Sequence, residues 1–318
     1  IRAWGIRIAG TLGFVLLLLF LDGQGALPLG EVFATLGRAN AWPVALSIAL
    51  YVPFLIVKAT RWSLVSGDMG MRLRWGSAWR VYAIGLAAGT FTPGQAGDAL
   101  KAWYLQRAGY PLGRALGGSV LDRLFDVAAL AVVGLIGVAV YGGRFAGQIP
   151  ALIGITLATV GIVAFFAWPR TRMWAIGLVT RRLSGAGGQG PGAGGAENGK
   201  GWSLGKATLA RCGVLTVAGF ATSIVRVWLL AGALGVWLGP LEVTGFAGLT
   251  TVAALVPVTV GGVGTRDVVA ALAFTQLGRP GAEGVAVSAL ILVLNRTQAV
   301  AGWVVWLRYR AATASLNK

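Results

Sequence analysis

Three arginines lie inside long apolar stretches of the chain, at positions 123, 226 and 296. An arginine facing lipid at the centre of a bilayer costs at least about 2.5 to 3.5 kcal/mol, so these residues should face a protein interior. Arg123 follows Leu112 by 11 residues and Arg296 follows Ala282 by 14. At 1.5 Å per residue both positions fall roughly 17 to 21 Å along a helix, near the middle of a membrane.

Four carboxylates are candidate charge partners for these cations: Asp98, Asp122, Asp126 and Asp267. The guanidinium fork matches two oxygens of a phosphate, so cations in excess of carboxylates predict an anionic ligand. The residues predicted to bind such a headgroup are Arg123, Arg296, Arg226, Arg266 and Lys101. The alternative is that pairs such as Asp98 with Arg123, or Asp267 with Arg296, are structural clamps.

The composition excludes most other chemistry. Of the 318 residues 56% are hydrophobic and 12% are charged, which indicates a membrane protein. The chain has one cysteine, Cys212, and no histidine, so it lacks the residues for a Cys/His metal site, a disulfide or a histidine base. We therefore expect no cofactor and no metal. The net charge is +17, and the lysines and arginines that produce it flank the apolar stretches. This placement indicates that they orient the chain in the membrane, and it does not indicate a nucleic-acid partner.

The apolar stretches predict an all-α polytopic protein, a single membrane domain over 1–318. Lys58 and Arg61 open a basic loop after the second span, and a second basic segment surrounds the glycine-rich linker 183–201. Both loops and both termini are therefore predicted to be cytoplasmic. The six full spans are expected at 1–23, 41–57, 112–141, 150–168, 207–237 and 282–307.

Two regions, 78–110 and 243–278, each combine two short apolar segments with a break rich in proline and glycine. Broken backbone at membrane depth is tolerated only where protein or a watery cavity surrounds it. We therefore expect two re-entrant helical hairpins. The residues of the breaks are Pro93, Gly94, Gly97, Pro257, Gly261, Gly262 and Gly264.

The two broken regions have matching flanks, which predicts an internal repeat with cores 78–141 and 243–307. Asp98 precedes Arg123 in LDR by 25 positions, and Asp267 precedes Arg296 in LNR by 29. Three full spans between the hairpins would make the repeat inverted, and paired interrupted segments of this kind indicate a transporter substrate site near the midplane.

The blocks TPGQAGDALKAWYLQRAG, SVLDRLFDVAAL and VPVTVGGVGTRDVVAALAFTQLG resemble those of the lysylphosphatidylglycerol synthase transmembrane-region family, also called flippase-like or UPF0104 proteins. The resemblance covers roughly 5–310 and implies lipid translocation. No soluble synthase domain follows, so we do not expect synthase activity. Relatives linked to polyprenyl-phosphate sugars leave the cargo open, and the family often has Glu where this chain has Asp98 and Asp267.

Together these features predict a flippase-like transporter of a prokaryotic cytoplasmic membrane, which moves an anionic phospholipid or a polyprenyl-phosphate-linked lipid. One alternative is a membrane-embedded transferase acting on a lipid-linked sugar, with Asp98 or Asp267 as the base. Another is a scaffold for an envelope-lipid enzyme, which would also be a possible partner of a transporter. The direction, the energy source and the oligomeric state are left open.

Overall fold

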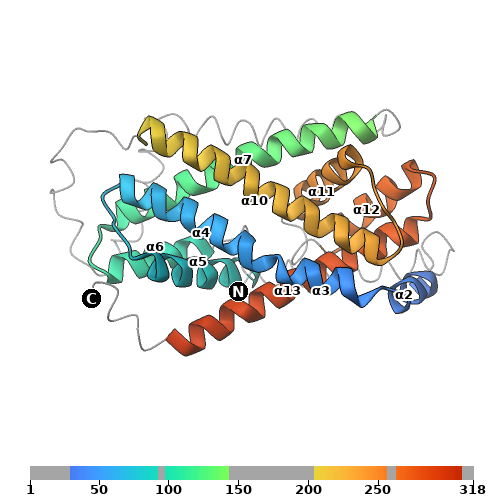
Figure 1. Cartoon of the computed structure of the whole chain (residues 1–318), viewed down its shortest axis with the longest axis horizontal. Helices are drawn as coiled ribbons and strands as arrows, with labels where there is room; N and C mark the ends of the chain where they lie inside the picture. The colour runs from blue at the N-terminus through green and yellow to red at the C-terminus, as the bar shows by residue number, and fades with distance from the viewer. Residues whose placement is uncertain (1–28, 92–96, 143–203, 256–262, 310–318) are drawn as a thin grey trace, which may run out of the picture. The chain divides into compact units, whose positions relative to one another are not determined.

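The computed structural model describes residues 29–91, 97–142, 204–255 and 263–309. All the regular secondary structure in these ranges is helical (Figure 1). The helices are α2 (Leu29–Gly37), α3 (Ala41–Ala49), α4 (Tyr51–Asp68), α5 (Trp75–Phe91), α6 (Gly97–Arg107), α7 (Leu112–Tyr141), α10 (Lys206–Ala233), α11 (Pro240–Leu255), α12 (Thr265–Gln276) and α13 (Gly281–Tyr309).

The chain divides into two compact units, and each is described by itself. The boundaries between them fall within long helices, so α4, α7, α10 and α13 each contribute to both. Unit 1 consists of Ile1–Val52, Leu130–Leu157 and Ala221–Gln298. Unit 2 consists of Pro53–Ala129, Ala158–Phe220 and Ala299–Lys318.

Four stretches of the described residues are long and apolar enough to cross a membrane: Ala41–Asp68, Leu112–Tyr141, Lys206–Ala233 and Gly281–Tyr309. The span expected at 112–141 is confirmed at both ends, and α13 exceeds the expected 282–307 by only a few residues. The spans expected at 1–23 and 150–168 and the linker 183–201 lie outside the described residues, so the total of six stays a prediction.

The span expected at 41–57 was given the wrong C-terminal boundary. Helix α3 ends at the C-cap Leu50, and α4 continues through Lys58 and Arg61. The break falls just before Pro53, whose missing N–H and bulky ring disfavour continuous helix there. Both basic residues are buried within α4 and do not open a loop.

Each broken region forms a pair of short helices packed against each other, α5 with α6 in unit 2 and α11 with α12 in unit 1 (Figure 1). In the second pair, the Thr265 hydroxyl at the start of α12 donates to the carbonyl of Ala253 in α11, at 2.9 Å. The sequence therefore predicted correctly that two short helices flank each break. The re-entrant course of the two pairs stays a prediction.

The second helix of each pair ends in the same way. Gly109 after α6 and Gly278 after α12 both have positive φ, 91° and 72°, a conformation that favours glycine. The N–H of the next residue then bonds back to the helix, from Tyr110 to Leu105 at 3.1 Å and from Arg279 to the equivalent carbonyl at 3.0 Å. A proline follows in each case and directly precedes the next long helix. Gly70 after α4 and Gly235 after α10 form the same cap, so the predicted repeat stays a prediction.

Helices α7 and α11 meet in unit 1 along facing glycines. A Cβ placed on Gly137 would lie 2.7 Å from the carbonyl oxygen of Gly245, and one on Gly248 would lie 2.7 Å from the carbonyl carbon of Val133. Such distances leave no room for a side chain. Small residues permit this close backbone approach, which is common between membrane helices.

We predict that Gly248→Ala lowers the thermal unfolding midpoint of the detergent-solubilised protein, because its methyl group would overlap α7. Overpacking of this kind typically costs about 1–3 kcal/mol. Gly213→Ala is the matched control, since no heavy atom outside its own helix lies within 4 Å of its added Cβ. Equal midpoints for the two variants would contradict the close contact.

Candidate functional site: buried charge clusters

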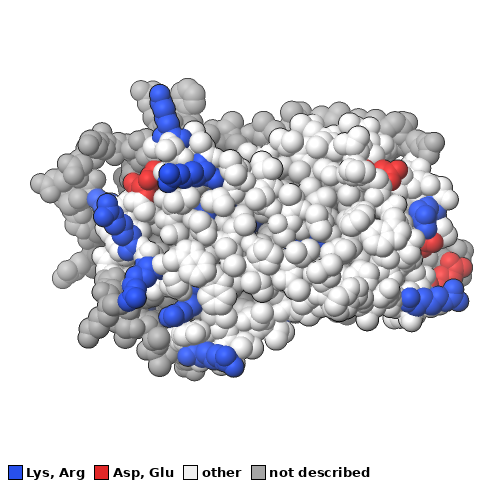
Figure 2. Space-filling model, in the orientation of Figure 1, with Lys and Arg blue, Asp and Glu red and all other residues white. Residues whose placement is uncertain are grey.

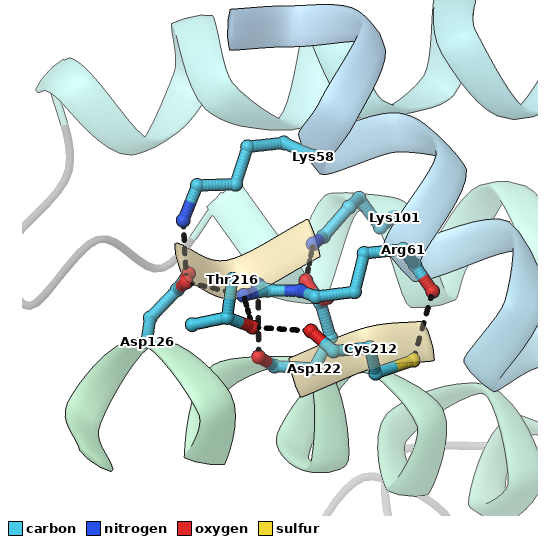
Figure 3. A network of polar contacts seen from close by, with 7 residues as sticks. All are labelled: Lys58, Arg61, Lys101, Asp122, Asp126, Cys212 and Thr216. Atoms are coloured by element: carbon cyan, nitrogen blue, oxygen red, sulfur yellow. Dashed lines mark hydrogen bonds and ion pairs between the residues drawn. The ribbon is translucent and has the colours of Figure 1, made fainter. Parts of the chain in front are cut away.

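A cluster of charged residues is buried in unit 2, where α4, α6, α7 and α10 meet (Figure 3). Lys58 and Arg61 lie one turn apart on α4, and the carboxylates of Asp122 and Asp126 lie one turn apart on α7. Lys101 on α6 completes the cluster. The two cations of α4, three residues apart, therefore face two carboxylates four residues apart, and both spacings place the pair on one helix face.

Arg61 is the centre of this cluster and is fully buried. Its Nε donates to Asp122 Oδ1 at 2.8 Å, and its Nη2 donates to the Asp122 carbonyl at 3.0 Å. Its Nη1 donates to Asp126 Oδ1 at 2.7 Å and to the Thr216 hydroxyl at 3.0 Å. That hydroxyl donates in turn to the carbonyl of Cys212 at 2.7 Å. Arg61 thus fixes α4 against both α7 and α10.

Lys58 lies at the edge of the cluster. Its ammonium donates to Asp126 Oδ1 and lies between two aromatic rings, 5.6 Å from the centroid of Phe54 and 5.2 Å from that of Phe220. The side chains of Lys58 and Asp126 are 8% and 16% exposed, whereas those of Arg61 and Asp122 are 0% exposed. The Lys58–Asp126 pair is therefore the more open part of the cluster.

Lys101 approaches the cluster from α6. Its Nζ lies 3.6 Å from Asp122 Oδ2, an ion pair beyond hydrogen-bond distance, and 4.4 Å from the centroid of the Tyr82 ring. The Trp62 ring is 5.5 Å away. A cation over an aromatic face gains electrostatic stabilisation, which grows when water is excluded. Lys101 was predicted to bind a headgroup, and the structure places it beside a carboxylate and two rings.

The sequence missed Lys58 and Arg61 as site residues. It named Asp122 and Asp126 as candidate partners of the arginines inside the apolar stretches; among the described residues they form ion pairs with the α4 cations and Lys101, and the charge of Arg123 also acts on Asp126. A signal was available: the K-x-x-R pattern on one apolar helix (i,i+3) and the D-x-x-x-D pattern on another (i,i+4) each place two charges about one turn apart on one helix face. Positive charge at the end of an apolar stretch was instead attributed to membrane orientation.

A second buried charge cluster lies in unit 1, between α12 and α13. Arg266 Nε donates to the Ser288 hydroxyl at 2.7 Å, and that hydroxyl donates to Asp267 Oδ1. Asp267 Oδ2 accepts from the backbone N–H of Gly264 at 2.8 Å. Because this carboxylate caps the start of α12, part of its role is structural.

One atom of this cluster has no hydrogen-bond acceptor within the described part of the chain. It is Nη2 of Arg266, whose residue is only 3% exposed. Arg296 on α13 lies near enough for its charge to repel that of Arg266. Buried polar groups are nearly always hydrogen-bonded, so an unpaired guanidinium donor here calls for an acceptor such as a ligand oxygen.

Arg226, also predicted to bind a headgroup, joins three helices of unit 1. Its Nε donates to the Ser47 carbonyl of α3 at 2.9 Å, and the Ser47 hydroxyl donates to the Arg226 carbonyl at 3.1 Å. With its amide oxygen turned toward the guanidinium, Gln298 of α13 accepts from Nη2 at 2.6 Å. These contacts give Arg226 a structural part and reduce the argument for a headgroup role.

The remaining predicted residues are placed less completely. Arg123 and Arg296 are partly buried on their helices, and their depth in a membrane stays a prediction. Gly264 is the N-cap of α12 with φ 100°, which fits the predicted need for glycine at that break. Gly97 is the first residue of α6 and Asp98 is the second, but the side chain of Asp98 is not among those that the structure describes. The other break residues, Pro93, Gly94, Pro257, Gly261 and Gly262, lie outside the described residues.

Comparison with known families supports the membrane interpretation. The family model described as lysylphosphatidylglycerol synthase TM region matches residues 3–302. The chain belongs to the lysylphosphatidylglycerol synthase transmembrane-region family. No curated protein matches the chain in a sequence search. As a member of this family with four long apolar helices, it is a multi-pass membrane protein related to proteins of lipid metabolism.

We predict that Arg61→Gln destabilises the protein strongly, by about 3–5 kcal/mol, because it leaves Asp122 buried without its main partner. The thermal unfolding midpoint in detergent measures this loss. Adding Asp122→Asn should recover part of it, since the uncompensated carboxylate is then removed. A double variant no more stable than Arg61→Gln alone would show that the pair does not hold the cluster together.

Proposed function

We propose that the protein is a lipid flippase that moves an anionic phospholipid or a polyprenyl-phosphate-linked lipid across a prokaryotic cytoplasmic membrane. The observation that carries the proposal is the buried guanidinium of Arg266, with an Nη2 donor that lacks an acceptor among the described residues. In a membrane protein related to proteins of lipid metabolism, a headgroup phosphate is the natural acceptor.

The surroundings of Arg266 favour an anion over a neutral ligand. The nearby carboxylate of Asp267 is already bonded to the Ser288 hydroxyl and the Gly264 N–H. Arg296 adds a second positive charge close by. An anionic oxygen at Nη2 would satisfy the unpaired donor and reduce the repulsion between the two guanidinium groups. The lipid chains would meanwhile stay in the hydrocarbon of the bilayer.

Transport further requires alternating access, for which we propose the predicted inverted repeat. The packed pairs of short helices, α5 with α6 and α11 with α12, support a duplicated hairpin. The support extends along the chain, because the spacing from Asp98 to Gly109 and then to Ser119 is the same as that from Asp267 to Gly278 and Ser288. Beyond these serines, Arg123 and Arg296 match only after a shift of one helical turn.

The charge at the helix ends supports the proposed orientation. Figure 2 shows Lys and Arg side chains gathered where α10 begins and where α13 ends, both in unit 2. Two acidic residues lie at described helix ends of this unit, Asp68 at the end of α4 and Asp98 at the start of α6. The basic ones are Arg72, Arg74, Arg80, Arg107, Arg114, Lys206, Arg211 and Arg308. By the positive-inside rule these ends, and with them both termini, face the cytoplasm.

We predict that Arg266→Gln and Arg296→Gln each slow the flipping of fluorescent phosphatidylglycerol in proteoliposomes by at least about tenfold, the loss expected for one charge-assisted hydrogen bond. Dithionite quenching of the outer leaflet measures the rate. Arg279→Gln is the control, because Arg279 forms an exposed surface pair with Glu283 in the same unit. Parental rates in both Gln variants, at normal stability, would contradict the proposal.

The orientation generates a separate prediction. In a Cys212→Ala background, a cysteine introduced at Gly190 should be inaccessible to a membrane-impermeant maleimide added outside intact cells, and should react after permeabilisation. Cys212 itself is buried, so its own labelling should be weak. Reaction of the Gly190→Cys variant from outside would reverse the proposed topology.

A further inference from the structure

The charge cluster of unit 2 contains a cation that can change partner without leaving a carboxylate unpaired. Arg61 is not that cation, because its donors are shared among Asp122, Asp126 and Thr216. Lys58 differs: among the described residues its ammonium has a single hydrogen-bond acceptor, Asp126 Oδ1. An ammonium has three N–H donors, so two remain for another oxygen.

Asp126 does not depend on Lys58 alone. The same Oδ1 atom accepts from Arg61 Nη1 at 2.7 Å, so this carboxylate keeps a charged partner if Lys58 turns away. Breaking the Lys58 contact therefore avoids the large cost of stranding a buried carboxylate. Arg61 has no comparable freedom, because Asp122 would lose both its Nε and its Nη2 contacts.

The surroundings of Lys58 also suit an exchange. Its ammonium is held between Phe54 and Phe220, which stabilise the charge without using its donors. The Lys58 and Asp126 side chains are the least deeply buried of the cluster. Lysine is a compact point charge on a flexible stem, so it can follow an anion that a rigid guanidinium fork cannot.

We propose that Lys58 binds the phosphate of a lipid headgroup. In the protein without lipid, the Asp126 carboxylate accepts the hydrogen bond from the Lys58 ammonium, and the phosphate replaces this carboxylate when the lipid binds. This site rests on the proposed lipid function and extends it to unit 2. In this proposal the Asp126 carboxylate competes with the ligand for Lys58. If the Lys58–Asp126 pair only held the helices together, there would be no such competition. Removing the cation and removing the carboxylate should then change lipid affinity in opposite directions.

The test measures the dissociation constant of the purified full-length protein for fluorescent phosphatidylglycerol in detergent micelles. Lys58→Met should weaken binding by about tenfold, the loss of one charge-assisted hydrogen bond. Asp126→Asn should strengthen binding, and the double variant should bind like Lys58→Met. Lys206→Met, the same change at an exposed lysine of α10, should leave binding unchanged.

Two results would overturn the proposal: parental affinity in Lys58→Met, or weakened affinity in Asp126→Asn at an unchanged unfolding midpoint. Competition by inorganic phosphate with an affinity similar to that of the lipid would assign the site to a free anion and also overturn it. Failure to displace the lipid supports a headgroup site. The flipping assay on the parent protein tests the proposed function separately. If the parent protein does not flip lipid but still binds it through Lys58, the proposed function is rejected and the Lys58 site is not.

Discussion

Burying a guanidinium away from water costs several kcal/mol unless its donors find acceptors, and this requirement shapes unit 2 around Arg61. The residue satisfies its donors with atoms from α7 and α10, which positions both helices against α4. Hydrophobic packing alone could not do this inside a bilayer, since lipid tails are as apolar as the helix faces. The buried charges therefore specify which helix faces meet, and the surrounding rings and small residues fill the space between them.

The two charge clusters solve this problem differently. In unit 2 carboxylates meet the cations directly, whereas in unit 1 the Ser288 hydroxyl stands between Arg266 and Asp267. A neutral bridge leaves the guanidinium less fully neutralised than a direct carboxylate contact does, and Arg266 retains an unpaired donor. The unit 1 cluster thus has unused capacity for an anion, and the unit 2 cluster gains such capacity only by exchange at Lys58.

Much of the helical plan could be predicted from the sequence, because apolar length and proline or glycine breaks are local signals. Helix α7 was predicted at both ends for this reason. The cluster around Arg61 was not, because its neutralising carboxylates come from a helix distant in sequence, and a lysine and an arginine after an apolar stretch also fit the pattern of a cytoplasmic boundary. Ser288 was missed because a hydroxyl carries no charge pattern along the chain.

The glycine contact between α7 and α11 has a consequence for helix register. Side chains that interdigitate normally fix how far one helix can slide along another. Facing glycines offer no ridges of their own, so the side chains of Leu249 and Val252 on α11 lie directly against Gly137 and Gly134 of α7. In unit 1 the Tyr141 hydroxyl, at the last residue of α7, also donates to the Glu242 carbonyl near the start of α11 at 2.8 Å. This directional bond therefore helps to fix the register of the helix to which the start of α12, and hence Arg266, is bonded.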